Sequence, residues 1–270
     1  MFLLHKFFRF CLGFYFCVCW WVGLGFVAVV LAGGYAKRLW PLTRDKPKPL
    51  LPVAGKPILA YILEKVLRVG VNRIILSTNL RFRSDFEGWL NRSGFVRVEV
   101  VADRSRREEE KPGAVKALAE ITKNIKDDCL ILAGDNIFTS GLEDMVKVFS
   151  RVYAPLIAVY DVGDFELAKR YSTVTLDSEG RIVEFVEKPE KPKTTLIGTC
   201  IYILPAKTLP RIGEYIDKGL GRDEPGRFIQ WLCKQETVYG YRLEGEWWDI
   251  GNIETYRDAD KYFSKLLSKG

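Results

Sequence analysis

The run Val27-Ala28-Val29-Val30-Leu31-Ala32-Gly33-Gly34 decides the fold class, because it is an unbroken apolar stretch that stops at two adjacent glycines. A short apolar run closed by a glycine turn is typical of a buried strand. The two glycines lack Cβ atoms, so main-chain N–H groups at the turn can approach an anion closely. The run therefore predicts a buried strand with an anion-binding site at its carboxyl end.

Strand-like and helix-like segments alternate from this run as far as residue 162. The predicted strands are 27–32, 73–78, 96–101, 129–133 and 155–162, and the predicted helices are 57–70, 84–90, 112–125 and one that starts with capping-box spacing from Ser140 to Glu143. Such alternation predicts a mostly parallel sheet with helices on both faces. We therefore expect an α/β fold, a Rossmann-like three-layer α/β/α sandwich.

The alternation changes after Tyr171. Segments 174–176 and 182–186 flank a turn at 177–180, which predicts a β-hairpin. The remaining predicted elements are a strand at 196–204, helices at 206–218 and 227–235, strands at 238–243 and 247–250, and a helix from Asn252. No linker separates these segments from the first part, so we expect one domain whose mixed sheet carries an inserted antiparallel part.

Histidine is missing from most of the chain. His5 is the only histidine in 270 residues, and none occurs from Phe26 onward. This composition excludes a Ser-His-Asp triad, a Cys-His pair and a His-ligated zinc site from the predicted domain. Its chemistry must therefore use carboxylates, Lys or Arg side chains, main-chain amides or a metal held by oxygen ligands.

The charge balance and the cysteines narrow the class further. A net charge of +7 suits an anionic small substrate, and no basic stripe interleaved with aromatic residues favours nucleic acid. The domain cysteines Cys129, Cys200 and Cys233 have no C-x-x-C spacing. They predict reduced thiols and a cytoplasmic protein rather than a disulfide framework.

The N-terminal segment is open to three interpretations. Residues 10–34 carry no charge, and Lys6 and Arg9 precede them, so the segment passes the length test for a membrane helix. Because 27–32 is expected to be a strand, the candidate span shrinks to 10–25. The segment is translated upstream sequence before a wrongly chosen start, a membrane or surface anchor, or a cleaved signal peptide. We therefore divide the chain into an apolar extension, 1–26, and one domain, 27–270, with membrane association only if the extension is real.

Two basic residues follow the glycine turn in the sequence. Arg38 can form paired hydrogen bonds with phosphate oxygens, and Lys48 lies in a loop stiffened by prolines. The loop is no Walker A motif, since Gly55-Lys56 is followed by Pro57, and the dinucleotide fingerprint is absent as well. A tight turn with a solvated basic loop is the alternative, but the combination of glycines, Arg38 and Lys48 favours phosphate binding.

Several motifs occur in an order that resembles one family. They are Gly33-Gly34 to Arg38-Leu39, Pro41-Leu42-Thr43, Lys48 to Val53, Gly134-Asp135-Asn136, Glu187-Lys188-Pro189 and Trp247-Trp248-Asp249-Ile250-Gly251. Together they resemble the sugar-phosphate nucleotidylyltransferases, such as glucose-1-phosphate thymidylyltransferases and mannose-1-phosphate guanylyltransferases. The resemblance implies transfer of a nucleotidyl group from an NTP to a sugar 1-phosphate, giving an NDP-sugar and pyrophosphate.

Asp135 and Asp249 lie at the ends of predicted strands, and their carboxylates are hard oxygen ligands that suit Mg²⁺. Either residue alone would be read as a loop cap, but as a pair beside basic partners they predict a magnesium site. With the resemblance, the expected catalytic residues are Arg38, Lys48, Asp135 and Asp249, of which the two aspartates are the metal ligands.

The resemblance also assigns binding roles. The expected nucleotide-binding residues are Leu31, Gly33, Gly34, Arg38, Lys48, Glu110, Gly113 and Asp135. The expected sugar-phosphate-binding residues are Asn136, Ser172, Glu187, Lys188, Thr199 and Tyr202. For the acidic run 108–110, a solvated charge cluster is the alternative to a place near the base.

Three departures from the family pattern leave the substrates open. Ser172 follows Tyr171 where the family has Gly, Cys200 replaces a Gly, and the loop 112–116 lacks the usual base-recognition residues. Two other functions therefore stay open: a non-catalytic regulatory subunit that binds NDP-sugar, and a membrane-associated cytidylyltransferase for a lipid headgroup phosphate such as inositol phosphate. The resemblance also implies a homo-oligomer.

Overall fold

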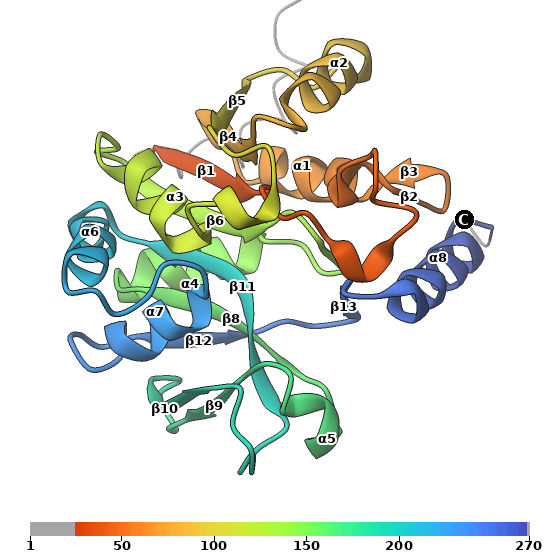
Figure 1. Ribbon diagram of the computed structural model, residues 1–270. Helices are drawn as coiled ribbons and strands as arrows, with labels where there is room; N and C mark the ends of the chain where they lie inside the picture. Colours follow the sequence, from red (N-terminus) through yellow and green to blue (C-terminus); the bar gives the residue numbers. More distant parts are fainter. Residues whose placement is uncertain (1–24, 269–270) are drawn as a thin grey trace, which may run out of the picture.

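The computed structural model describes residues 25–268 (Figure 1). The interpretations of the N-terminal extension fall almost wholly outside this range. Among the described residues, no helix combines the length and the apolar character that crossing a membrane requires. The described chain forms a mixed, mostly parallel sheet between two layers of helices, which confirms the expected α/β class.

Four parallel strands form the first half of the sheet. Strand β1 (Phe26–Leu31) lies between β4 (Arg73–Asn79) and β6 (Asp128–Ala133), and β5 (Val98–Asp103) is paired with β4. Residues 26–30 of β1 are all buried, as an apolar run without alternation predicts for a central strand. Because these strands are parallel, their carboxyl ends lie along one edge of the sheet.

Strand β11 (Leu196–Leu204) joins the parallel strands to the antiparallel part. One of its edges pairs with β9 (Ser172–Leu176) near Ile197 and then with β6 from Ile201 onward, while β8 (Leu156–Asp161) follows the other edge. Strand β10 (Ile182–Glu187) completes the hairpin with β9, and β12 (Tyr239–Arg242) lies beside β8. The hairpin projects below the helical layers in Figure 1.

Alternate residues of β1 face two separate cores. Ala28 and Val30 pack against α1 (Ile58–Arg68), α4 (Glu143–Val152) and α8 (Ile253–Leu267), with α2 (Arg83–Ser93) at the same face. Val27 and Val29 pack against α3 (Ala114–Thr122), α6 (Pro210–Asp217) and α7 (Pro225–Leu232). Each fully buried aliphatic side chain contributes about 1.5–3 kcal/mol, so the two cores hold the three layers together.

The capping box predicted at Ser140 is wrong. Helix α4 begins at Glu143 without a side-chain cap, and the buried Ser140 hydroxyl has no hydrogen-bond partner among residues 25–268. The reason is the path of the loop: Thr139 N–H donates to the Glu246 carbonyl, and the Lys65 ammonium holds the carbonyls of residues 139 and 140. The box that forms is at α8, between Asn252 and Thr255.

Several short elements have no counterpart in the sequence prediction, among them β2 (Pro52–Val53) and β3 (Lys56–Pro57), which pair with each other. Strand β7 (Asn136–Phe138) pairs antiparallel with β13 (Trp247–Asp249), outside the main sheet. Helix α5 (Phe165–Ala168) is capped by the Asp164 carboxylate, which accepts from two main-chain N–H groups. The β7–β13 ribbon matters most, because it brings the last motif of the chain to the end of β6.

Gly134, which follows β6, provides a test of close packing at this edge. A Cβ at Gly134 would lie 2.9 Å from the Leu31 carbonyl oxygen and 3.3 Å from Pro49 Cγ. We therefore expect Gly134→Ala to lower the free energy of unfolding by about 1–3 kcal/mol, measured by urea denaturation. Gly34→Ala is the matched control, since a Cβ there meets nothing within 4 Å. Equal stability of the two variants would contradict this account.

Candidate active site

The edge where the parallel strands end collects three motif residues from distant parts of the chain. Asp135 follows β6, and in the β7–β13 ribbon Asp249 lies opposite Asn136. The Ile250 N–H donates to the Asp135 carbonyl at 3.1 Å. The ribbon thereby fixes Asp249 beside Asp135, as the sequence pairing of the two aspartates predicts.

Lys48 completes this group. Its ammonium lies 2.5 Å from Asp135 Oδ2 and donates to the Ile250 carbonyl at 2.9 Å. The Lys48 side chain is only 13% exposed. A buried ion pair gives a net benefit only when further hydrogen bonds satisfy its remaining donors and acceptors, and the Ile250 carbonyl meets that need. Lys48 is therefore a fixed cation at this edge.

Asn136 orients Asp135 instead of facing a sugar. Its Nδ2 donates to Asp135 Oδ1 at 3.1 Å, and its Oδ1 accepts from Trp247 Nε1 at 3.2 Å. The residue is buried, so both polar ends of the amide are used inside the protein. The structure thus places Asn136 behind the Asp135 carboxylate, and the sugar-phosphate contact that the resemblance implied stays a prediction.

The electrostatics of the edge favour a bound cation. Burial, followed by the charge of Asp135, raises the pKa of the Asp249 carboxyl to about 6, although Lys48 and Arg38 oppose the shift. Burial and the Asp249 charge also raise the pKa of Tyr171. Two carboxylates that destabilise each other's charge form a donor set that a divalent cation would relieve.

The donor set fits Mg²⁺ better than a metal held by protein ligands alone. Among residues 25–268, no cluster of three or more His, Cys, Asp or Glu side chains could hold a metal ion. Mg²⁺ commonly binds through one or two carboxylates plus substrate phosphates and water. Asp135 and Asp249 are therefore the residues that would hold it.

The glycine turn lies at the same edge. The Gly134 N–H donates to the Leu31 carbonyl, and Asn79 Nδ2 donates to the Gly33 carbonyl at 3.1 Å. The space above Gly34 is open. Arg38 is exposed, and its charge lowers the pKa values of both Asp249 and Tyr171. The arrangement leaves Arg38 on the solvent side of the aspartate pair.

The acidic run after β5 is tied to the glycine-rich loop. Lys37 lies 2.8 Å from Glu108 and 3.2 Å from Glu109, and Glu110 accepts the Arg106 N–H at 2.8 Å. The run thus contacts Lys37 while staying largely exposed, and the Glu110 carboxylate is engaged by its own loop, so both the solvated cluster and a place near the base stay open.

Gly113 is required by a contact that the sequence did not reveal. Its φ is +97°, and a Cβ there would lie 2.4 Å from the Arg222 carbonyl oxygen. The lack of a side chain at Gly113 therefore lets the segment before α7 pack against the start of α3, and the predicted role of Gly113 in nucleotide binding is a separate matter.

The sugar-phosphate candidates Ser172, Glu187 and Lys188 do meet. The Ser172 hydroxyl donates to the Glu187 carboxylate, whose side chain is only 9% exposed. Lys188 has φ +45° and places its ammonium 3.3 Å from Glu187. The left-handed backbone at Lys188 turns this side chain out of β10, with half of it exposed.

Thr199 and Tyr202 take other positions. The Thr199 hydroxyl is buried and donates to the Ala158 carbonyl of β8. Tyr202 is buried in the core under α3, α6 and α7, and burial raises its pKa well above the ordinary value. The neighbouring strands and helices cover both side chains, and their contact with a sugar stays a prediction.

Three residues were missed as site candidates. Gly134 allows the strand ends to approach, the Ile250 carbonyl holds Lys48, and the Glu224 carboxylate lies 3.0 Å from the Lys188 ammonium. The first two belong to quoted motifs and could have been assigned. Nothing in the sequence marked Glu224, which is 36 positions from Lys188.

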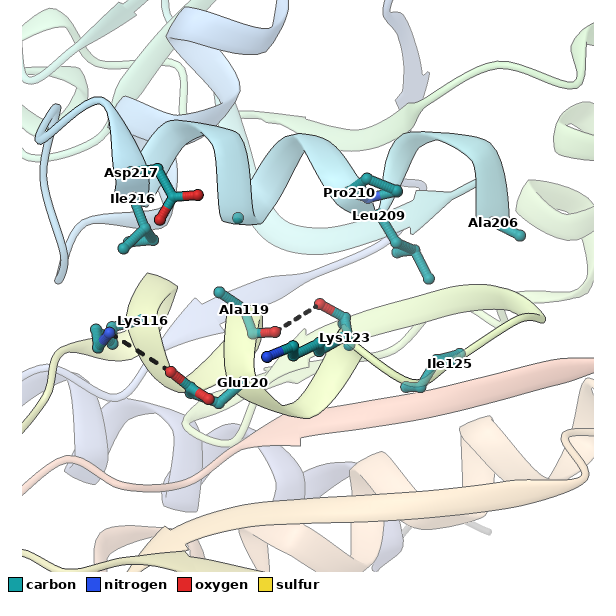
Figure 2. A pocket seen from close by; sticks show the side chains of 12 residues that line it. Lys116, Ala119, Glu120, Lys123, Ile125, Ala206, Leu209, Pro210, Ile216 and Asp217 are labelled. Atoms are coloured by element: carbon teal, nitrogen blue, oxygen red, sulfur yellow. Dashed lines mark hydrogen bonds and ion pairs between the residues drawn. The ribbon is translucent and has the colours of Figure 1, made fainter.

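A pocket of about 340 Å³ lies elsewhere, between α3 and α6 (Figure 2). Lys116 and Glu120 form an ion pair at 3.4 Å on its α3 wall, while Leu209, Pro210 and Ile216 come from the opposite wall. None of the residues predicted for catalysis, metal binding or sugar binding lines it. The pocket is therefore separate from the edge that carries Asp135.

Asp249 gives a stability test with a definite sign. The folded carboxyl keeps its proton up to about pH 6, whereas an unfolded one loses it near pH 4. Its ionisation therefore reduces the free energy of unfolding as the pH rises through that window. In the metal-free protein, Asp249→Asn should be about 1–3 kcal/mol more stable than the parent at pH 7, with the gain disappearing toward pH 4.

The difference in the free energy of unfolding between the variant and the parent is measured by urea denaturation in EDTA. The two pH values, 4.5 and 7, lie at about the two ends of the window. Asp144→Asn, at an exposed position on α4, is the control and should match the parent at both values. A variant at Asp249 that is less stable than the parent at neutral pH would contradict the account.

Comparisons with known proteins place this geometry in a family. The Nucleotidyl transferase family profile matches residues 27–265. A bifunctional protein GlmU of Methanocaldococcus jannaschii is 34% identical over 90% of this chain and 54% of its own length. A UTP–glucose-1-phosphate uridylyltransferase, AglF, of Haloferax volcanii is 28% identical over 87% of this chain and 95% of its own length.

A UDP-glucose pyrophosphorylase solved with UDP-glucose has the same fold, with a TM-score of 0.75 and 20% identity over 90% of this chain and all of that one. The chain spans about half the length of the GlmU relatives. The profile match and the ordered motifs together lead to one conclusion: this chain belongs to the nucleotidyl transferase family.

Proposed function

We propose that this protein transfers a nucleotidyl group from a nucleoside triphosphate to a sugar 1-phosphate, with release of pyrophosphate, in a reaction that depends on Mg²⁺. The observation that supports it best is the group formed by Lys48, Asp135 and Asp249 at the carboxyl edge of the parallel strands. Ligands of open α/β sheets bind at this edge. The family membership supports the same reaction class.

The nucleophile is a phosphate oxygen of the sugar 1-phosphate. It is ionised near neutral pH, because the second pKa of a phosphate is about 6. Its in-line attack on the α-phosphorus, with pyrophosphate leaving from the opposite side, therefore needs no general base. A reaction that needs no general base agrees with the absence of histidine from residue 26 onward.

The positive charges at this edge have different roles in the proposed reaction. Lys48, fixed by Asp135 and the Ile250 carbonyl, orients the α-phosphate. Arg38, which is exposed to solvent beside this edge, stabilises charge on the transferring phosphoryl group and on pyrophosphate. Asp135 and Asp249 would hold Mg²⁺, which would supply the remaining neutralisation of phosphate charge.

The sugar side uses the β9–β10 hairpin. Lys188 holds the phosphate of the sugar 1-phosphate, and Glu187 accepts hydroxyl groups of the sugar. Ser172 fixes the Glu187 carboxylate, and the Gln230 side chain accepts the Glu187 N–H at 2.9 Å. The carboxylate is thereby oriented before a substrate arrives.

A matrix of nucleoside triphosphates against sugar 1-phosphates tests the reaction by release of pyrophosphate. UTP with glucose 1-phosphate is the first pair, since the relative that is matched over nearly its full length is named for it. CTP with inositol 1-phosphate covers the lipid-headgroup reaction. We expect at least one pair to react with Mg²⁺ and to stop with EDTA. No release from any pair would contradict the proposal.

Asp135→Asn tests the metal assignment in the active pair. The amide keeps the shape of the side chain but loses the charge that holds the cation, so kcat should fall at least about 100-fold. Asp144→Asn is the matched control and should keep the parental rate, because its partner Lys147 lies on the same surface of α4. Near-parental turnover in a folded Asp135→Asn protein would refute the assignment.

A further inference from the structure

The segment 219–224, which we call the strap, joins α6 to α7 and is fastened to the start of α3. The Arg222 carbonyl accepts the N–H groups of Val115 at 2.9 Å and Lys116 at 3.1 Å. The Ala114 N–H donates to the Asp223 carboxylate at 3.2 Å. The strap thus satisfies N–H groups that the first turn of a helix leaves without intrahelical partners.

The other Asp223 oxygen fastens the strap a second time, because it lies 2.7 Å from the Lys111 ammonium. Gly221, with φ +147°, lets the strap pass the Tyr215 hydroxyl, which a Cβ would approach to 2.9 Å. Glu224 comes directly after Asp223, so the contacts with the loop before α3 also set the position of Glu224.

Glu224 contacts Lys188, the residue that holds the sugar phosphate in the proposed reaction. Its carboxylate is 3.0 Å from the Lys188 ammonium and also contacts the Arg227 guanidinium. Lys188 is at the same time 3.3 Å from Glu187. In the free protein, the Lys188 charge is thus shared between two carboxylates from different parts of the chain.

An arriving phosphate cannot displace both carboxylates with equal ease. Glu187 is held by the Ser172 hydroxyl, and Gly226 leaves so little room that a Cβ there would lie 1.9 Å from the Glu187 carboxylate. The Glu224 side chain is 37% exposed and keeps Arg227 as a partner when it leaves Lys188. Glu224 is therefore the group that yields.

We propose that Glu224 sets the affinity for the sugar 1-phosphate, because it occupies Lys188 in the free enzyme and must be exchanged for the substrate phosphate. This inference rests on the proposed function. The apparent affinity for a ligand falls in proportion to the fraction of protein whose site is free to bind it. A dianionic phosphate can replace Glu224 at Lys188, whereas a sugar without phosphate has no charge with which to do so.

Glu224→Gln tests the exchange in the NTP and sugar 1-phosphate pair that reacts in the matrix. Exposed ion pairs contribute about 0.2–1 kcal/mol, so the KM for the sugar 1-phosphate should fall about 1.4- to five-fold, with little change in the KM for the NTP. Inorganic phosphate, used as an inhibitor that competes with the sugar 1-phosphate, should become more potent by a similar factor. A loosened or misfolded site would not produce a gain of affinity.

Two variants make the outcomes distinct. Glu214→Gln removes a carboxylate that contacts Lys218 at 2.8 Å on α6, and it should leave both KM values unchanged. Lys188→Gln should raise the KM for the sugar 1-phosphate at least about ten-fold. Glu224→Ala serves as a second variant if Glu224→Gln folds poorly, and the same fall in KM is expected.

An unchanged or higher KM in both Glu224 variants, with a raised KM in Lys188→Gln, would overturn the role of Glu224 and leave the proposed reaction intact. An unchanged KM in Lys188→Gln would remove Lys188 from the proposed function, and the inference about Glu224 would fall with it.

Discussion

The ion pair between Lys48 and Asp135 is the contact on which the edge of the sheet depends. It joins a loop near the start of the domain to the end of β6, and through the Ile250 carbonyl it reaches the last motif of the chain. Charges taken out of water are costly unless their hydrogen bonds are complete. Here the Asn136 amide donates to the second oxygen of Asp135, and the Trp247 indole N–H donates to Asn136 and so holds the amide in place.

This arrangement supports the proposed binding of phosphate and a metal at the edge. Lys48 and Arg38 partly offset the mutual repulsion of the two aspartates, yet Asp249 still has a raised pKa. The folded chain therefore keeps an electrostatic cost that a divalent cation would remove. Functional sites commonly hold such costs, which the cores on the two faces of the sheet must offset.

Much of the fold could be predicted because its signals are local. The apolar run of β1, the glycine that closes it and the alternation as far as β8 each follow from a few neighbouring residues. The site residues Lys48, Asp135 and Asp249 could be paired because all three follow recognisable motifs. Ser140 failed as a cap because a distant residue, Lys65, determines the path of its loop.

The surroundings of the side chains predicted to bind the sugar phosphate are harder to foresee from sequence, for another reason. In a strand, successive side chains point to opposite faces, so a shift of one position changes what a residue touches. Thr199 faces the β8 main chain, whereas its neighbour Cys200 packs toward the opposite core. Glu224 could not be found from sequence, since its place depends on how the strap meets α3.

Strand β11 carries a consequence for how such a protein diverges. Near its start, at Ile197 and Gly198, it is paired with the β9–β10 hairpin, and from Ile201 onward it is paired with β6, the strand that Asp135 follows. A recombination event that exchanged the hairpin as a module would have to cut through this single strand. New sugar preferences are therefore accessible mainly through point substitutions on β9, β10 and the strap, while the frame that carries the phosphate chemistry is inherited whole.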